Sequence, residues 1–199
     1  GQATLDNVIV SYGGGSGYDN IQVNGGSLTL TNSLVAYSNS DGVHATGASP
    51  TISNTTFLNN ANNGAYLTTS SPTVLSPTLA NNTFTGNGSY AVYLSSGALT
   101  PNLSGNTGSG NTYNAIYVTG SITGTATLSP NPNLAYRPAS LSISQGASLT
   151  LQPGVVLKPS IGYYLYVYGS LTAQGTSGSP IVFTSFKDDG YGGDSNGDG

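Results

Sequence analysis

Acidic side chains gather near the end of the chain, where their spacing could bind a metal ion. Four of the seven aspartates lie between positions 188 and 198. The run Asp194-x-Asn196-x-Asp198-Gly199 places oxygen ligands at alternate positions before a glycine, as in the opening of a calcium-binding loop. The sequence stops short of the twelfth-position carboxylate of such a loop, and a solvated acidic turn is the alternative. We expect weak Ca²⁺ binding through Asp188, Asp189, Asp194, Asn196 and Asp198.

The remaining acidic residues and the histidine suggest no catalytic site. Asp6, Asp19 and Asp41 are interpreted as falling at different places in the sequence repeat described below, and His44, the only histidine, has no evident partner. Hydrolysis of a glycosidic bond needs two carboxylates that flank the bond. We therefore expect a protein without enzymatic activity, in which His44 is a surface residue.

Tyrosine recurs at one outward position of a repeated short strand. The column, at intervals of 22 to 27 residues, consists of Gln22, His44, Tyr66, Tyr93, Tyr117, Ser142 and Tyr166, with Tyr164 and Tyr168 beside its last member. Tyrosine suits exposed strands and stacks on itself across them, which accounts for the column structurally. It also offers a flat apolar ring with a polar tip to a sugar or a protein surface. We predict a binding surface formed by Tyr66, Tyr93, Tyr117, Tyr164, Tyr166 and Tyr168.

Threonine fills a second outward column. Its members are Thr4, Thr29, Thr51, Thr78, Asn102, Thr127, Thr150 and Thr172. Threonine favours exposed strands, which is the simpler interpretation. A flat grid of hydroxyl groups also looks like the face of solenoid ice-binding proteins, although the neighbouring column that begins at Asp6 is irregular. Ice binding is therefore a second alternative function.

The elements that carry these columns repeat about every 24 residues. Inward apolar positions recur at Leu5, Leu30, Ile52, Leu79, Leu103, Leu128, Leu151 and Ala173, and a turn-forming residue follows each two positions later. The tyrosine column has its own inward partners, namely Ile21, Val43, Ala65, Val92, Ile116, Leu141 and Leu165. A third strand is indicated at Val10, Val35, Phe57, Phe84 and Val156, but Gly108 and Asn133 interrupt it. The repeat predicts an all-β parallel solenoid over residues 1–186, with about eight coils of three strands each. Residues 187–199 form an acidic loop that we expect to interrupt a longer solenoid.

The composition agrees with this fold and excludes several functions. About half of the residues are Gly, Ser, Thr or Asn, which favour turns and strands over helix interiors. With three basic residues and a net charge of −4, the chain has no basic surface for nucleic acid. No apolar run is long enough for a membrane span, so we expect no membrane insertion.

The repeat resembles that of the single-stranded right-handed parallel β-helix proteins, which include pectin-degrading enzymes and many secreted bacterial surface proteins. The segment Ser40–His44 resembles one strand motif of the polygalacturonases, but their paired Asp-Asp, Gly-His-Gly and Arg-Ile-Lys motifs are absent. Pectate-lyase chemistry would need acidic calcium ligands beside a basic residue, and Arg137 and Lys158 have no aspartate near them in coil register. A polysaccharide-active enzyme, or its remnant, is the first alternative function.

The segment Ser179–Ser185, which leads into the acidic loop, also resembles a recurrent segment of large secreted bacterial β-helix proteins. That resemblance implies an extracellular, calcium-rich setting and a longer chain. We expect a structural or adhesive surface module that contacts polysaccharide or stacks end to end with itself or with further coils. Glycosylation acceptor motifs occur at Asn54, Asn81, Asn87 and Asn102.

Overall fold

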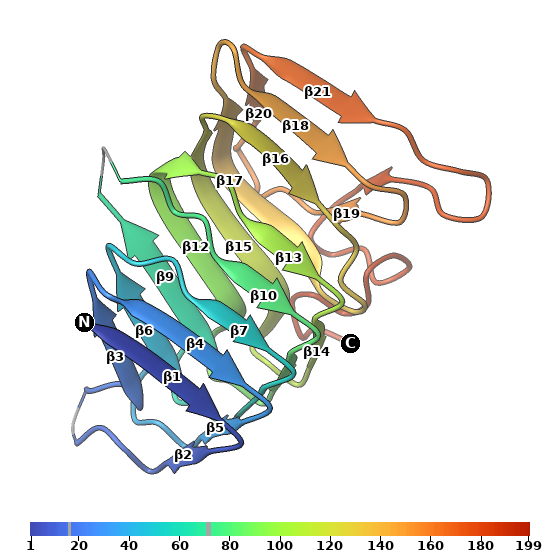
Figure 1. The fold of residues 1–199 in the computed structure, drawn as a ribbon. Helices are drawn as coiled ribbons and strands as arrows, with labels where there is room; N and C mark the ends of the chain where they lie inside the picture. Colours follow the sequence, from blue (N-terminus) through green and yellow to red (C-terminus); the bar gives the residue numbers. More distant parts are fainter. Residues whose placement is uncertain (16, 71–72) are drawn as a thin grey trace.

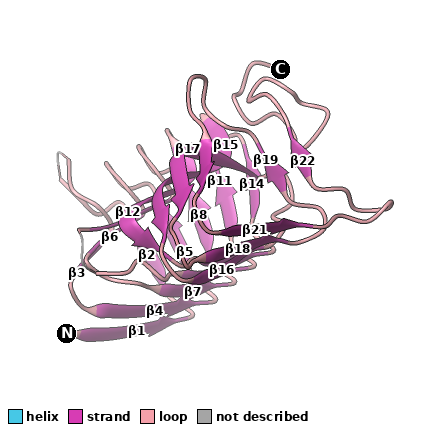
Figure 2. Ribbon diagram, turned by 90° about the horizontal axis from the view of Figure 1, so that it is seen from above, coloured by secondary structure: helices cyan, strands magenta, loops and turns pink. Residues whose placement is uncertain are grey.

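The structure is a computed structural model that describes residues 1–15, 17–70 and 73–199. In these residues the chain is an all-β parallel solenoid, and strands one coil apart pair in parallel (Figure 1). The coils enclose a narrow interior between three faces (Figure 2). None of the described residues lies in a helix that could cross a lipid bilayer.

The threonine face is built from the strands that carry the leucine column. Its first sheet contains β1 (Gln2–Asp6), β4 (Ser27–Thr31), β7 (Thr51–Ser53), β10 (Thr78–Ala80) and β13 (Asn102–Ser104), and its second contains β16 (Thr125–Leu128), β18 (Ser148–Leu151) and β21 (Ser170–Ala173). The predicted register is confirmed in both sheets, since Leu5 pairs with Leu30 and Leu128 with Leu151. The chain makes about seven turns, close to the eight coils expected.

The third face follows the threonine face in each of the first five coils. It contains β2 (Ile9–Ser11), β5 (Leu34–Ala36), β8 (Thr56–Leu58), β11 (Thr83–Thr85) and β14 (Thr107–Ser109). The expectation that Gly108 interrupts this face is wrong, because Gly108 lies inside β14 and pairs with Phe84. A Cβ atom at Gly108 would come within 2.3 Å of Leu134, so the leucine side chain occupies the space that a larger residue would fill.

The tyrosine face completes each coil and is the longest sheet. It contains β3 (Ile21–Asn24), β6 (Val43–Thr46), β9 (Ala65–Thr69), β12 (Tyr90–Leu99), β15 (Tyr113–Ile122), β17 (Ala135–Ile143), β19 (Val156–Leu157) and β22 (Val182–Phe183), with β20 (Leu165–Val167) paired to β17. Val156 therefore lies in this face and not, as predicted, in the third face.

One predicted register on the tyrosine face is wrong. Ile116 pairs with Tyr136 instead of Leu141, which pairs with Gly120. The strand β17 begins earlier than the predicted segment, and its pairing shifts between Val118 and Gly120, where Gly120 has a φ of 124°. Such a bulge places extra residues on one strand, so counting coils by the average repeat missed it.

The corner between the threonine face and the third face depends on left-handed backbone conformations. Asn7, Asn32, Asn54, Asn81 and Gly105 occupy it with φ between 51° and 65°. Asparagine and glycine tolerate this region better than other residues. The turn formers predicted at these positions are therefore confirmed.

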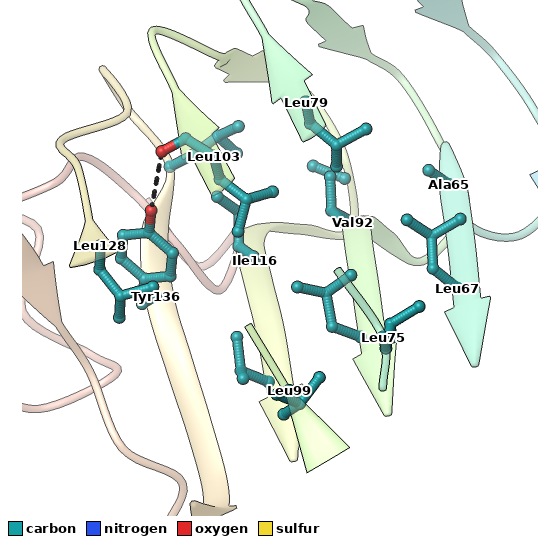
Figure 3. Close-up of a cluster of buried hydrophobic side chains, with 14 of the residues drawn as sticks. Ala65, Leu67, Leu75, Leu79, Val92, Leu99, Leu103, Ile116, Leu128 and Tyr136 are labelled. Carbon is teal, nitrogen blue, oxygen red and sulfur yellow. Dashed lines mark hydrogen bonds between the residues drawn. The ribbon is translucent and has the colours of Figure 1, made fainter. Parts of the chain in front are cut away.

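The core is a continuous column of apolar side chains. Leu79, Leu103, Val92 and Ile116 are fully buried in it, and Tyr136 reaches across the interior to the carbonyl oxygen of Leu103, 3.3 Å away (Figure 3). The few apolar residues per coil are sufficient because every inward side chain lies against its equivalents in the coils above and below.

Two buried asparagine ladders reinforce the corners, and sequence reasoning missed both. In one, Asn82 donates to Asn106, which donates to Asn131, at 2.9 and 2.8 Å. In the other, Asn60 donates to Asn87, which donates to Asn111, at 2.8 and 2.7 Å. The ladders could have been predicted from asparagines that recur one coil apart in the sequence. Because the amide of Asn87 is buried in its ladder, this acceptor motif is not accessible in the folded protein.

Candidate functional site

The first half of the tyrosine face carries a ladder of stacked rings. Tyr66 and Tyr93 lie with ring centroids 4.7 Å apart at 20°, and Tyr93 and Tyr117 lie 4.5 Å apart at 11°. His44 packs against Tyr66 edge-on, at 4.8 Å. Because neighbouring rings cover one another's faces, this ladder presents mainly ring edges and hydroxyl groups to solvent. Tyr66, Tyr93 and Tyr117 are therefore together, as predicted, but they do not form a flat aromatic platform.

The ladder ends at Arg137, which stands where the sequence predicted Ser142. Arg137 pairs with Tyr117, and its guanidinium lies 3.9 Å from the ring centroid of Phe186. It also donates hydrogen bonds to the hydroxyl groups of Tyr90 and Ser160. Arg137 thus fixes the aromatic side chains around it through cation–π contacts and hydrogen bonds.

The tyrosines around β20 form a separate group. Tyr166 pairs with Ser142, which pairs with Ser121, so it does not continue the column of Tyr117. Tyr164, Tyr166 and Tyr168 are 67%, 44% and 69% exposed. The rings of Tyr166 and Tyr168 are nearly parallel, with centroids 6.3 Å apart. The predicted binding residues therefore fall into two groups, and the second is the more accessible.

Burial makes the ladder hydroxyl groups harder to ionise. It raises the pKa of Tyr90 to about 12, although the nearby Arg137 opposes the shift. It also raises the pKa values of Tyr93 and Tyr117, and the neighbouring tyrosines add to this effect. At neutral pH these side chains stay protonated and can both donate and accept hydrogen bonds.

A cluster near the start of the tyrosine face corrects the prediction for the acidic residues. The Nδ1 atom of His44 lies 3.1 Å from Asp19 Oδ2 and 3.6 Å from Asp41 Oδ2. Asp19 and Asp41 thus occupy equivalent places in adjacent coils, and His44 has two carboxylate partners. The sequence carried the signal, since each aspartate lies two positions before an inward residue, Ile21 or Val43.

The acidic loop brings together part of the predicted calcium set. The carboxylates of Asp189, Asp194 and Asp198 lie within 4.8 Å of one another. Asn196 donates to Asp198 at 2.6 Å, while its own Oδ1 is buried without a hydrogen-bond partner. Asp188 lies outside this group, and its carboxylate accepts hydrogen bonds from Thr184 and the backbone of Gly190.

The loop folds back against the solenoid through Lys158, which sequence reasoning also missed. The Lys158 ammonium donates to the carbonyl oxygens of Asp188 and Gly193 and to Ser195 Oγ, at 2.6, 2.8 and 2.9 Å. Asn114 donates to the carbonyl oxygen of Asp194, at 3.0 Å. The prediction that no aspartate lies near Lys158 in coil register did not anticipate this contact with the loop. It depended on coil register, which a loop that folds back does not follow.

Comparison with known protein families matches residues 1–131, about two thirds of the chain, to the family described as a right handed beta helix region. Comparison with curated proteins gives no match, and comparison with solved structures gives none either. The matched residues include the His44 cluster and the ladder from Tyr66 to Tyr117, and they coincide with the regular coils of the solenoid. The chain therefore belongs to the right-handed β-helix family.

Proposed function

We propose that this chain is a non-enzymatic module of an extracellular β-helix protein and that its tyrosine face contacts polysaccharide. The observation that carries the proposal is the exposed group Tyr164, Tyr166 and Tyr168. Accessible aromatic rings pack against the apolar faces of sugars, and their hydroxyl groups form hydrogen bonds with sugar hydroxyls. The hydroxyl edge of the Tyr66–Tyr117 ladder is a second, less accessible group on the same sheet.

The charges favour an uncharged polysaccharide. The net charge is −4, and the chain has only three Lys and Arg residues. Arg137 is engaged by its aromatic neighbours, and Lys158 is buried under the acidic loop. The face therefore offers little positive charge to the carboxylates of a polyuronate.

Co-sedimentation with insoluble cellulose and with calcium-free polygalacturonate gel tests this proposal. We expect the wild-type protein to bind cellulose. The double change Y164A/Y168A should weaken this binding at least about tenfold, which is the free energy that roughly one aromatic contact contributes. The matched control is T29A/T51A on the threonine face, which should bind as wild type. Equal binding by both double variants, or no binding to either polysaccharide, overturns the proposal.

Self-association is a second candidate, favoured by a hollow of about 320 Å³ between β1 and β3. Leu5, Ile21, Val23 and Leu28 line it and are suited to pack against a further coil of a second copy. Light scattering at high concentration should detect assemblies that the I21K variant disperses. A wild-type protein that stays monomeric contradicts this candidate.

Calcium binding at the acidic loop forms part of the same extracellular proposal. Asp189, Asp194 and Asp198 supply converging carboxylates, and the unpartnered Oδ1 of Asn196 is an oxygen ligand without a competing hydrogen bond. Extracellular modules commonly bind Ca²⁺ at about 10⁻⁴–10⁻³ M.

Cleavage of polysaccharide is the remaining alternative, and it would depend on the Asp19–Asp41 pair. Both carboxylates face the His44 imidazole instead of flanking an open space, so a glycosidic oxygen would have to displace the imidazole. Release of reducing ends from cellulose or pectin, abolished by D41N, would support this alternative over the binding module.

A further inference from the structure

The cluster of Asp19, Asp41 and His44 is not needed for the proposed carbohydrate contact. Its three potential ligand atoms all lie within 4.8 Å of one another. We propose that this cluster binds a divalent transition-metal ion of the Zn²⁺ type through Asp19 Oδ2, Asp41 Oδ2 and His44 Nδ1.

The distances fit such an ion. Zinc binds imidazole nitrogen and carboxylate oxygen at about 2.0–2.2 Å, so two ligands of a tetrahedral site lie roughly 3.3–3.5 Å apart. The His44 Nδ1 atom lies 3.1 Å from Asp19 Oδ2 and 3.6 Å from Asp41 Oδ2. These two separations fall on either side of the ideal value. The two carboxylates lie within 4.8 Å of each other, so they would have to approach by at most about 1.5 Å to complete the site.

The negative charges of the cluster favour the binding of a cation. The side chains of Asp19 and Asp41 are each only 7% exposed, and among the described residues their ion-pair partner is His44 alone. All three Lys and Arg residues of the chain, Arg137, Lys158 and Lys187, belong to later coils. Two buried carboxylates side by side are costly unless a positive charge compensates both. A divalent ion between them supplies that charge.

Neighbouring groups hold the ligands in place. Asp19 Oδ1 accepts a hydrogen bond from the backbone of Asp41 at 3.0 Å, and Asp41 Oδ1 accepts two from Asn63 at 2.9 and 2.8 Å. Each carboxylate therefore keeps its Oδ2 free for the cluster. The Nε2 atom of His44 lies 3.3 Å from Thr46 Oγ1, and a proton on Nε2 leaves the Nδ1 lone pair for a metal.

The ligand types set the class of metal. An imidazole with two carboxylates suits Zn²⁺, Co²⁺ or Ni²⁺, whereas Ca²⁺ takes six to eight oxygen ligands. Three protein ligands also leave room for water. The cluster is therefore distinct in chemistry from the acidic loop, where every ligand is an oxygen.

Titration of metal-free protein tests the proposal. Calorimetry with Zn²⁺ at pH 7 should show one site with a dissociation constant below about 10⁻⁶ M, and Co²⁺ should give visible absorption bands of a low-symmetry site. The H44Q variant should weaken zinc binding at least about 100-fold, because it removes the nitrogen ligand. Absence of zinc binding, or an unchanged affinity in H44Q, overturns the proposal and leaves His44 as a simple ion-pair partner of the carboxylates.

The chain offers matched controls. The H44Q change introduces the residue that Gln22 already provides in the preceding coil, and D41N introduces the residue that Asn63 provides in the next. Both variants should fold, which circular dichroism verifies, and both should lose zinc. The D194N variant should keep it. Loss of zinc in D194N but not in H44Q would place the ion in the acidic loop and overturn the assignment.

Discussion

The Lys158 ammonium donates a hydrogen bond to Ser195 Oγ, 2.9 Å away, and both side chains are fully buried. The contact joins residues that are 37 positions apart and secures the acidic loop to the solenoid. Burial lowers the pKa of Lys158, and the neighbouring carboxylates of Asp189, Asp188 and Asp194 oppose that shift. The loop and the solenoid thus depend on each other for charge compensation.

Replacing Lys158 with methionine should release the loop. The change keeps the apolar stem but leaves the acceptors on Asp188, Gly193 and Ser195 without their donor. Each unsatisfied buried group costs about 1–3 kcal/mol, so we expect faster hydrogen exchange and proteolysis over residues 187–199. The exposed Lys187→Met change is the control and should stay within about 0.5 kcal/mol of wild type. An unaltered exchange pattern in Lys158→Met would show that the ammonium does not anchor the loop.

The Asn106→Ala change should destabilise the solenoid strongly. It removes the Asn106 acceptor from both the backbone N–H and the side-chain amide of Asn82, and it removes a donor from the Leu79 carbonyl oxygen. With more than one buried group unsatisfied, we expect the free energy of unfolding to fall by about 2–4 kcal/mol in urea titrations. Asn102→Ala on the exposed threonine face should change it by less than about 0.5 kcal/mol. Similar losses in the two variants would contradict a special role for the ladder.

Calcium should bind the acidic loop through some of its aspartates and not others. D194N should weaken Ca²⁺ binding at least about tenfold, because it removes a charged ligand from the group formed with Asp189 and Asp198. D188N should bind nearly as well as wild type, since Asp188 lies outside that group of three carboxylates. Calorimetric titration measures both. No heat with wild-type protein, and no calcium-dependent rise in melting temperature, would exclude the site.

Alkaline pH should destabilise the fold through the half-buried side chain of Tyr90. Its pKa is about 12 in the folded protein, against an ordinary value of 10.0. The unfolded chain loses this proton first, so stability is lost as pH rises from 10 towards 12. Tyr90→Phe has no such proton, and its unfolding free energy should decline less than that of wild type in this window. Below pH 10 the two curves should run parallel. Curves that also stay parallel from pH 10 to 12 would show that Tyr90 ionises equally in both states.

The regular part of the fold follows from short-range rules that the sequence displays. The pairing of Leu5, Leu30, Ile52 and Leu79 is predictable because a constant corner, with asparagine in a left-handed conformation, precedes each third-face strand. The shift at Ile116 is not predictable from the repeat. A bulge between Pro138 and Leu141 changes the register, whereas the predicted segment from Leu141 to Ile143 alternates regularly and gives no sign of it.

The sites were harder to predict than the coils. The proximity of Asp19 and Asp41 was predictable, since their spacing along the chain equals that of Ile21 and Val43. The contact of Lys158 with Ser195 was not, because a loop that folds back obeys no period. The stacking of Tyr93 on Tyr117 follows from the register, but the resulting loss of accessible ring faces depends on side-chain orientation.

The corners of the solenoid differ in how much the number of residues between two faces varies from coil to coil. From Leu30 to Val35, and from Ile52 to Phe57, the chain always uses five residues, whereas the step from Val43 to Ile52 takes nine and that from Ala65 to Leu79 takes fourteen. A foreign peptide inserted after the tyrosine face would leave the inward side chains of all later strands at their inward positions. The same insertion at the asparagine corner would shift the inward positions of all later coils. Of these two corners, the one after the tyrosine face is therefore the one suited to display new sequences.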